Sequence, residues 1–297
     1  MTANFNYTEA FSRNIGWITD AEQQILRGKR VAIAGMGGVG GAHLLTLTRL
    51  GVGKFYIADL DTFELANFNR QVGATTATLG QQKVEVLFRQ ALEINPELDL
   101  RMFPTGLNTD NLDDFLRDVD LFVDGLDFFA PDIRSLAFGR CHALGIPAIT
   151  AGPIGMGAPY LIFLPGGMSF EQYFRLDGQP VERQYVNFLL GLTPTALHRG
   201  YLVEPGRLNL AGRSGPSTGM ACQLCAGIVG IEALKILLGR SPVHAAPWYQ
   251  IFDAYRGRYI RGRLRWGNRG PLQTIKRWIA YRAVRQRLAQ ERSAALI

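Results

Sequence analysis

The sequence predicts an open, doubly wound α/β sheet, mostly parallel, and three observations carry this prediction. Short apolar runs bounded by glycines recur through the first 150 residues and are typical of buried parallel strands. Stretches with apolar residues at helical spacing separate these runs, which is the alternation expected of strand–helix–strand units. A glycine cluster joins the first apolar run to the helical stretch after it, where a tight strand-to-helix turn is needed.

The elements follow in order along the chain. Thr19 and Glu22 form a capping box, because each side chain can satisfy the other's exposed N–H group, so a helix opens there. An amphipathic helix is expected over residues 81–95, ended by Pro96. The expected strands are residues 30–34, 54–59, 98–103, 121–124, 148–151, 160–164, 248–253 and 255–263.

The second half of the chain departs from this alternation. Residues 166–218 are rich in Gly and Pro without clear periodicity, which indicates a long crossover that is a functional lid or is partly disordered. Residues 219–238 are apolar nearly all round, which indicates a buried helix; Glu232 and Lys235 argue against a membrane span. We therefore expect one domain over residues 1–270 and a basic helix over 271–297.

Composition limits the classes of protein. With 47% hydrophobic and 19% charged residues the chain can bury a sizeable core. The first fourteen residues lack the basic start and apolar stretch of a secretory signal, so we expect a cytoplasmic protein. From Arg256 onward the chain has twelve basic residues and one acid, Glu291, so this segment carries a net charge of +11. Because the whole chain carries +7, the first 255 residues carry −4.

The glycine cluster has the form G-x-G-x-x-G between a strand and a helix. Gly35 permits the tight turn, Gly37 lets backbone approach a phosphate, and Gly40 lets the helix pack on the strand. The helix N-terminus, which includes Gly38, offers N–H groups to an anion. Asp59 ends the second strand, where a carboxylate can accept ribose hydroxyls. The pattern predicts a nucleotide site without distinguishing NAD from ATP.

The following stretch favours ATP. Arg70 and Lys83 lie where a dehydrogenase needs no cations, whereas a triphosphate needs them to bind and to stabilise departing pyrophosphate. The alternative is that both are solvated surface charges. Asp124 and Asp127 come at the carboxyl end of the 121–124 strand, where a carboxylate can hold magnesium. The alternative for these acids is a helix N-cap or a solvated loop position.

At this point the sequence resembles the ThiF/MoeB/HesA adenylyltransferases, prokaryotic relatives of ubiquitin-activating enzymes. The motifs that carry the resemblance are Arg13-Asn14, the glycine loop, D-x-D at Asp59 and Asp61, N-x-N-R-Q from Asn67 to Gln71, Lys83, Asp127, and Phe252-Asp253-Ala254. The resemblance implies ATP and Mg²⁺ as cofactors, and activation of a carboxylate, usually the C-terminal glycine of a ubiquitin-like protein, as an acyl-adenylate.

The resemblance also implies roles for individual residues. Asp59 would hold the ribose, Asp127 would orient magnesium, and Arg13 would reach the triphosphate, often from the other subunit of a homodimer. The phosphates would be contacted by Asn67, Arg70, Gln71 and Lys83. The family commonly has an Arg five residues after the strand-end Asp, but Arg134 comes two residues later.

The cysteines leave several readings open. Many relatives have two Cys-x-x-Cys pairs that bind zinc, but this chain has only Cys222 and Cys225, so zinc is not expected. Core packing is the expected role of both. The alternative is thioester or acyl-persulfide chemistry, for which the helix N-terminus would lower the thiol pKa.

The function predicted is ATP-dependent adenylation of the C-terminus of a ubiquitin-like protein or peptide by a homodimer. One alternative is an enzyme similar to the tRNA threonylcarbamoyladenosine dehydratases; another is an NAD-dependent oxidoreductase, and a third is a non-catalytic nucleotide-binding scaffold. The basic tail either packs its Trp278, Ile279 and Leu288 face on the body or on a dimer mate, or contacts RNA or an anionic membrane.

Overall fold

The computed structural model describes residues 5–209 and 212–294, with side chains through Gln286. Within these residues eight strands form one sheet in the order β3-β2-β1-β4-β5-β6-β7-β8. The first five strands in this order are parallel, and β6, β7 and β8 continue the sheet antiparallel. The strands are β1 (Arg30–Ala34), β2 (Lys54–Ala58), β3 (Asp99–Phe103), β4 (Leu121–Asp124), β5 (Ala148–Ala151), β6 (Gly157–Phe163), β7 (Trp248–Asp253) and β8 (Arg258–Arg263).

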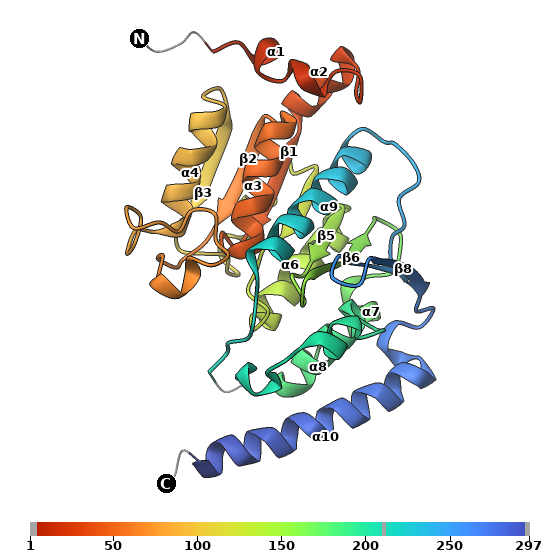
Figure 1. Cartoon of the computed structure of the whole chain (residues 1–297). Helices are drawn as coiled ribbons and strands as arrows, with labels where there is room; N and C mark the ends of the chain where they lie inside the picture. Colours follow the sequence, from red (N-terminus) through yellow and green to blue (C-terminus); the bar gives the residue numbers. More distant parts are fainter. Residues whose placement is uncertain (1–4, 210–211, 295–297) are drawn as a thin grey trace.

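Helices cover both faces of the sheet (Figure 1). They are α1 (Tyr7–Ala10), α2 (Asp20–Gly28), α3 (Gly38–Leu50), α4 (Lys83–Ile94), α5 (Leu112–Phe115), α6 (Pro131–Leu144), α7 (Phe170–Phe174), α8 (Val181–Leu192), α9 (Gly219–Leu237) and α10 (Pro271–Ala294). The 3₁₀ turns are η1 (Ser12–Asn14), η2 (Leu65–Asn67), η3 (Leu197–Tyr201), η4 (Pro205–Arg207) and η5 (Gly267–Arg269). The predicted doubly wound fold is confirmed.

Alternate residues of β1 enter two different cores. Val31 and Ile33 pack in the core that holds α3, α4 and α9, whereas Ala32 and Ala34 pack in the core that holds α5, α6, α7 and α8. This division follows from the period of two along a strand, which sends successive side chains to opposite faces. It also explains why the central strands β1, β4 and β5 are buried nearly throughout, since each is covered on both sides.

Residues 166–192 of the crossover are more ordered than their composition suggested. Phe170 and Phe174 of α7 and Phe188 of α8 are buried in the second core, so the alternative of partial disorder was wrong for these two helices. The structural signal in the sequence was the helical spacing of Val181, Tyr185, Phe188 and Leu192. A capping box between Ser169 and Gln172 opens α7.

One described helix, α9, is long and apolar enough to cross a membrane by length and composition. It packs against α3 and also lies on β6, with Val229 and Ala233 fully buried. These contacts place α9 as a core helix, as its composition predicted. The ion pair between Glu232 and Lys235 lies near its C-terminal end.

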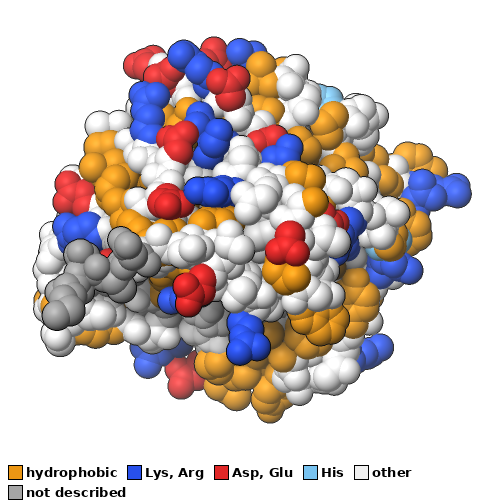
Figure 2. All heavy atoms as spheres, turned by 90° about the horizontal axis from the view of Figure 1, so that it is seen from above, with side chains coloured by type: hydrophobic (Ala, Val, Ile, Leu, Met, Phe, Trp, Pro, Cys, Tyr) orange, Lys and Arg blue, Asp and Glu red, His pale blue; other side chains and the backbone are white. Residues whose placement is uncertain are grey.

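The two edges of the sheet are occupied differently. β1, β4 and β7 end at the edge where α3 begins, and α1 and α2 lie at the opposite edge (Figure 1). Tyr7 on α1 donates from its hydroxyl to the carbonyl of Gly51, just after α3 ends. Seen from above, from the side of α1 and α2, acidic and basic side chains are interspersed on the surface (Figure 2).

The basic tail forms α10, which packs along α8 and η5. Residues 295–297 of the predicted helix lie outside the described part of the chain. Trp278 and Ile279 are 59% and 57% exposed, so they do not pack on the body of their own chain. The alternative in which the tail packs this face on the body is therefore wrong. The side chain of Leu288, which that alternative also names, lies outside the described residues.

Candidate functional site

The glycine loop connects β1 to α3 without space for larger side chains. Gly35 has φ of +89°, and a Cβ there would lie 2.2 Å from the carbonyl oxygen of Gly125. A Cβ on Gly40 would lie 1.7 Å from the carbonyl oxygen of Gly35. These close approaches require glycine at both positions. They bring the loop against the end of β4, so the first turn of α3 faces the residues after that strand.

The N-terminus of α3 has open hydrogen-bonding capacity. Its N-cap is Gly37, and no side chain caps the first turn. A Cβ on Gly37 would meet only Gln71 Nε2, at 3.8 Å, so there is room above this residue. The first N–H groups of a thirteen-residue helix are therefore available to an anion.

Asp59 joins the end of β2 to the glycine loop. Its carboxylate accepts hydrogen bonds from the backbone N–H of Met36, at 2.6 Å, and of Asp61, at 2.8 Å. Burial raises the pKa of Asp59, and these two hydrogen bonds act in the lowering direction. The acid predicted to hold the ribose thus lies directly beside the predicted phosphate loop.

Lys83 is a buried cation and not a solvated one. Its Nζ lies 2.9 Å from Asp61 Oδ2, and its side chain is 8% exposed while that of Asp61 is 59% exposed. The backbone N–H of Lys83 also donates to the Asp61 carbonyl at 2.9 Å. Two bonds between the same residues fix the start of α4 against the segment after β2. The surface-charge alternative is therefore wrong for Lys83.

Two members of the N-x-N-R-Q segment reach the start of α3. A Cβ on Gly38 would lie 3.6 Å from Arg70 Cγ, so the arginine stem lies against the first turn. Arg70 Nη1 donates to the Ala66 carbonyl and to Asn69 Oδ1, at 2.8 and 2.9 Å. Gln71 is 7% exposed, and its Oε1 has no hydrogen-bond partner among the described residues. A buried amide oxygen without a partner is costly, which marks this position as one that a ligand could satisfy.

The Asn67 side chain forms a hydrogen bond within its own turn. Its Oδ1 accepts from the backbone N–H of Glu64 at 3.0 Å, and the residue is 8% exposed. This bond closes the 3₁₀ turn that places Arg70 and Gln71. The described geometry therefore gives Asn67 a positioning contact within the segment.

Asp124 and Arg134 form a buried pair under the loop that follows β4. Arg134 Nη2 donates to the carbonyls of Leu126 and Asp127, at 2.7 and 2.9 Å, and the Thr150 hydroxyl donates to Asp124 Oδ2 at 2.7 Å. Asp124 is 3% exposed, so its interpretation as an N-cap or solvated acid was wrong. Sequence reasoning missed this role of Arg134.

Asp127 is exposed at the same edge of the sheet. One of its carboxylate oxygens, Oδ1, accepts from the Phe129 N–H at 2.8 Å. Magnesium in nucleotide sites is commonly held by one or two carboxylates together with phosphate oxygens and water, so one exposed Asp fits such an ion. No group of three or more His, Cys, Asp or Glu side chains arranged to hold a metal occurs in the described residues.

Cys222 and Cys225 lie beneath the loop in the α3–α9 interface. Both are buried, and a Cβ on Gly38 would lie 2.9 Å from Cys222 Sγ. Burial raises the pKa of both thiols, against the lowering expected from the helix N-terminus. The direction is opposite to that expectation, because desolvation of the thiolate is the largest cause of the pKa shift at both residues. The geometry agrees with core packing.

Arg13 is separated from the rest of the predicted site. It is exposed on η1, whose Asn14 donates from Nδ2 to the carbonyl of Leu50 at the far end of α3. Thirteen helical residues span about 20 Å, so the chain does not bring Arg13 to its own glycine loop. The remaining predicted residues do gather at one edge.

A hydrogen-bonded contact that sequence reasoning missed ties the crossover to the same edge. The Tyr201 hydroxyl donates to Asp253 Oδ2 and accepts from the Met156 N–H, both at 3.0 Å. Asp253 ends β7 and is buried. A further contact joins the end of the crossover to the site, since Asn69 Nδ2 donates to the Ser217 carbonyl at 2.9 Å. In the sequence, the Phe252-Asp253-Ala254 motif was the pattern that could have indicated a role for Asp253.

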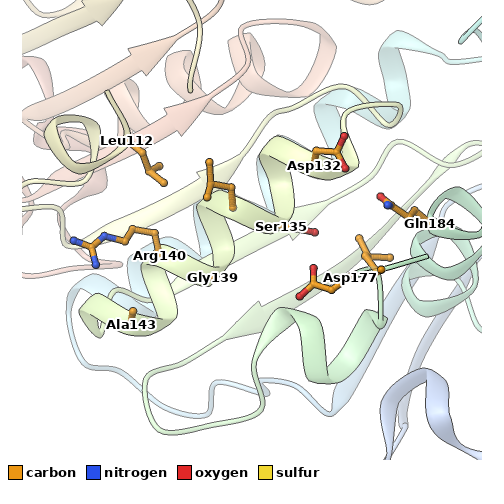
Figure 3. Close-up of a pocket in the computed structure, with 11 residues that line it drawn as sticks. Leu112, Asp132, Ser135, Gly139, Arg140, Ala143, Asp177 and Gln184 are labelled. Carbon is orange, nitrogen blue, oxygen red and sulfur yellow. The ribbon is translucent and has the colours of Figure 1, made fainter. Parts of the chain in front are cut away.

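A separate cavity of about 570 Å³ lies along the outer face of α6 (Figure 3). Asp132, Ser135 and Arg140 line it from α6, and Asp177 and Gln184 face them from the crossover. None of the predicted site residues lines it, so it is distinct from the glycine-loop edge.

Comparison with known proteins gives the family. Residues 11–271 match the model of the ThiF family. The chain is 32% identical over 143 residues to the sulfur carrier protein ThiS adenylyltransferase of Escherichia coli, which is 48% of this chain and 56% of that protein. It is 33% identical over 144 residues to the tRNA threonylcarbamoyladenosine dehydratase of Bacillus subtilis, with 48% and 55% covered.

Solved structures share the fold. A complex of Escherichia coli MccB with MccA has a TM-score of 0.65 at 20% identity, covering 91% of this chain and 75% of that one. PaaA has a TM-score of 0.64 at 19% identity, covering 89% and 77%. The chain spans about half the length of these two curated relatives. Because the family model matches nearly the whole chain, the protein belongs to the ThiF family.

Proposed function

We propose that this protein is an ATP-dependent adenylyltransferase that converts a carboxylate into an acyl-adenylate and releases pyrophosphate. The observation that carries the proposal is the convergence of the uncapped α3 N-terminus, Arg70 and the unsatisfied Gln71 amide at one point. Asp59 lies against the same loop, and Asp127 lies at the same edge of the sheet. Relatives named as adenylyltransferases support the assignment.

The chemistry needs positioning more than acid–base catalysis. A carboxylate is ionised near neutral pH, with a pKa of about 3.5, and is already the nucleophile. The barrier comes from bringing two anions together and from charge that accumulates on the leaving pyrophosphate. The α3 N–H groups and the Arg70 guanidinium would bind phosphate oxygens and stabilise that charge. When bound, magnesium would neutralise part of the phosphate charge beside Asp127.

Lys83 would act from a fixed position. Its ion pair with Asp61 orients the ammonium group at the start of α4, and the exposed side of Asp61 faces solvent. A triphosphate that approached this pair would find a cation already held in place, which reduces the entropy lost on binding. We therefore assign phosphate contacts to Arg70, Gln71 and Lys83, with Asn67 holding their segment in shape.

Nucleotide choice is the first test of the proposal. ATP with magnesium should raise the melting temperature, and NAD should not, because the cations gather where a nicotinamide ribose would need none. The variant Arg70→Ala should show a smaller ATP-dependent shift than wild type, and Arg89→Ala, which changes an exposed arginine on α4, should keep the full shift. Stabilisation by NAD alone would reject the adenylyltransferase in favour of an oxidoreductase.

The substrate carboxylate is proposed to be the C-terminus of a ubiquitin-like protein or peptide. The support comes from similar proteins, which include the adenylyltransferase for the sulfur carrier protein ThiS and MccB in complex with MccA. Incubation with cell extract, ATP and magnesium, followed by mass spectrometry, should detect a species whose C-terminus carries an added AMP. Adenylation of a small metabolite only would contradict the protein or peptide assignment.

A second candidate function has comparable support in sequence. The tRNA threonylcarbamoyladenosine dehydratase of Bacillus subtilis matches at 33% identity, as closely as the ThiS enzyme. ATP turnover that depends on added tRNA, with no adenylated peptide in extract, would favour this candidate.

We also propose a cytoplasmic homodimer. The support for a dimer is the position of Arg13, which lies about one α3 length from its own glycine loop and could reach a triphosphate only in a second subunit. Analytical ultracentrifugation would measure the state directly. Cell fractionation would test the compartment.

A further inference from the structure

Helix α10 packs on the body through polar side chains. Gln273 Nε2 donates to the Leu190 carbonyl at 3.0 Å, and Lys276 Nζ donates to the Pro194 carbonyl at 2.8 Å. Arg277 Nε donates to Asn187 Oδ1 at 2.7 Å. Gln273 is 2% exposed, so these contacts lie in the helix–helix interface with α8. The inward side of α10 is thus held by hydrogen bonds.

Four large apolar side chains of α10 point outward instead. Leu272 is 64% exposed, Trp278 59%, and Ile275 and Ile279 57% each. The spacing 272, 275, 279 with 278 beside it places these four on one side of the helix over about two turns. We call them the outer stripe. A helix on a soluble protein ordinarily buries its apolar side and exposes its polar one, so α10 is inverted.

Cations continue the outer stripe toward the C-terminus of α10. Arg282 lies with its guanidinium carbon 4.8 Å from the centre of the Trp278 ring, and both Arg282 and Arg285 are exposed. These cations belong to a segment that carries a net charge of +11 on a chain whose first 255 residues carry −4. The outer stripe and these two arginines together place aliphatic, indole and guanidinium groups on one exposed side of α10.

From this inversion we propose that the outer stripe of α10 docks on an anionic lipid bilayer. Aliphatic side chains and tryptophan enter the boundary between headgroups and acyl chains, and adjacent arginines bind anionic headgroups. Since the opposite side of α10 is hydrogen-bonded to α8, the helix would lie flat on the surface with the body above it (Figure 1).

Two other binding partners, RNA and a second copy of α10, explain the outer stripe less well. RNA offers phosphates to the arginines but leaves Leu272, Ile275 and Ile279 without an apolar partner. A second copy of α10 would bury the stripe but would bring two segments of +11 charge together. A bilayer that contains anionic lipid satisfies both the apolar and the charged groups.

The test is sedimentation of the full chain with vesicles at 50 mM salt. Vesicles of phosphatidylcholine with 30% phosphatidylserine should bind the protein, and pure phosphatidylcholine should bind it at least about tenfold more weakly. The stripe variant Ile275→Ser with Trp278→Ser should lower binding to the anionic vesicles by about tenfold or more. Circular dichroism would verify that the variants stay folded, as expected for exposed positions.

Two controls separate the stripe from general effects. Trp17→Ser changes a tryptophan that is 86% exposed at the opposite edge of the molecule, and it should leave vesicle binding unchanged. Arg282→Gln with Arg285→Gln should weaken binding to anionic vesicles while leaving the weak binding to phosphatidylcholine unchanged.

The result that overturns the proposal is full-length protein that ignores anionic vesicles at low salt. Salt-sensitive binding to a single-stranded RNA homopolymer in that case would assign the cations to RNA. A concentration-dependent dimer that the stripe variant abolishes, without vesicle binding, would assign the stripe to a second copy. Equal vesicle binding by wild type and the stripe variant would also reject the outer stripe as the membrane contact.

Discussion

The Arg134 guanidinium donates through Nε to the Asp124 carboxylate at 2.8 Å, and both side chains are 3% exposed. The same guanidinium holds two carbonyls of the loop that leads to Asp127. The pair therefore links β4 to α6 and shapes the backbone that presents the predicted magnesium ligand. A buried pair of this kind is costly to break because the remaining charge has no partner.

Replacing Arg134 by Ala should destabilise the fold by about 3–5 kcal/mol, because it leaves Asp124 buried and uncompensated. Denaturant unfolding would measure this difference. The matched control is Arg140→Ala on the same helix, which removes an ion pair with Asp113 whose side chains are 40% and 71% exposed. That control should cost less than about 1 kcal/mol. Equal losses of unfolding free energy in the two variants would show that the buried pair contributes no more to stability than the exposed pair.

Arg70→Ala and Lys83→Ala should lower turnover more than nucleotide affinity, since their charges matter most as pyrophosphate leaves. The loss of one such donor costs about 3 kcal/mol in the transition state. Exchange of labelled pyrophosphate into ATP with the carboxylate substrate present, together with nucleotide titration, would separate the two effects. Exchange at the normal rate in both variants would refute the assignment of these cations.

Asp127→Asn should remove the magnesium dependence of ATP binding. We expect wild-type protein to show a larger ATP-dependent thermal shift with magnesium than with a chelator, and the variant to show the same small shift in both. Asp132→Asn, an exposed acid on α6, is the control and should behave as wild type. A variant that keeps the full magnesium effect would place the ion elsewhere.

Arg13→Ala and Asp127→Ala should each be inactive alone and complement each other when mixed. A mixed dimer has one site in which both residues are intact, if Arg13 acts on the partner's nucleotide. Refolding the two variants together at equal amounts should restore about a quarter of wild-type exchange, as random pairing of subunits requires. No recovery would mean that Arg13 acts within its own chain or not at all.

Cys222→Ser and Cys225→Ser should leave adenylation intact, and elemental analysis should find no stoichiometric zinc. Because burial raises the pKa of both thiols, they should react slowly with iodoacetamide near pH 7 until urea unfolds the chain. A raised folded pKa contributes stability below the unfolded pKa, about 8.5, and that contribution is lost as pH rises further. Fast alkylation of folded protein at pH 7 would contradict this account.

Local patterns were sufficient to predict the first half of the fold. The glycine loop, β1 and α3 are adjacent in sequence, and their turn geometry depends on backbone sterics that glycine alone satisfies. The capping box at Thr19 is likewise formed by residues three apart. The meeting of Asp59 with the loop could be predicted because neighbouring parallel strands end at one edge.

Contacts between distant elements were not predictable in the same way. Periodicity shows which side of a helix is apolar but not what covers it, so α8 was missed in the crossover, and whether α10 packs its apolar side was left open. Burial reversed the sign of the pKa shift expected for Cys222, because the local dipole is known from sequence and the desolvation is not.

The sequence by itself determined the sheet, the phosphate loop and the identity of the residues beside it, since these depend on interactions over a few residues or on strand-end position. Only the tertiary structure decided that Arg134 neutralises Asp124, that Arg13 lies at the opposite edge from its own loop, and that the outer stripe of α10 faces solvent. The physical reason is that pairing, separation and burial depend on how elements pack, and the same helix pattern is compatible with several neighbours.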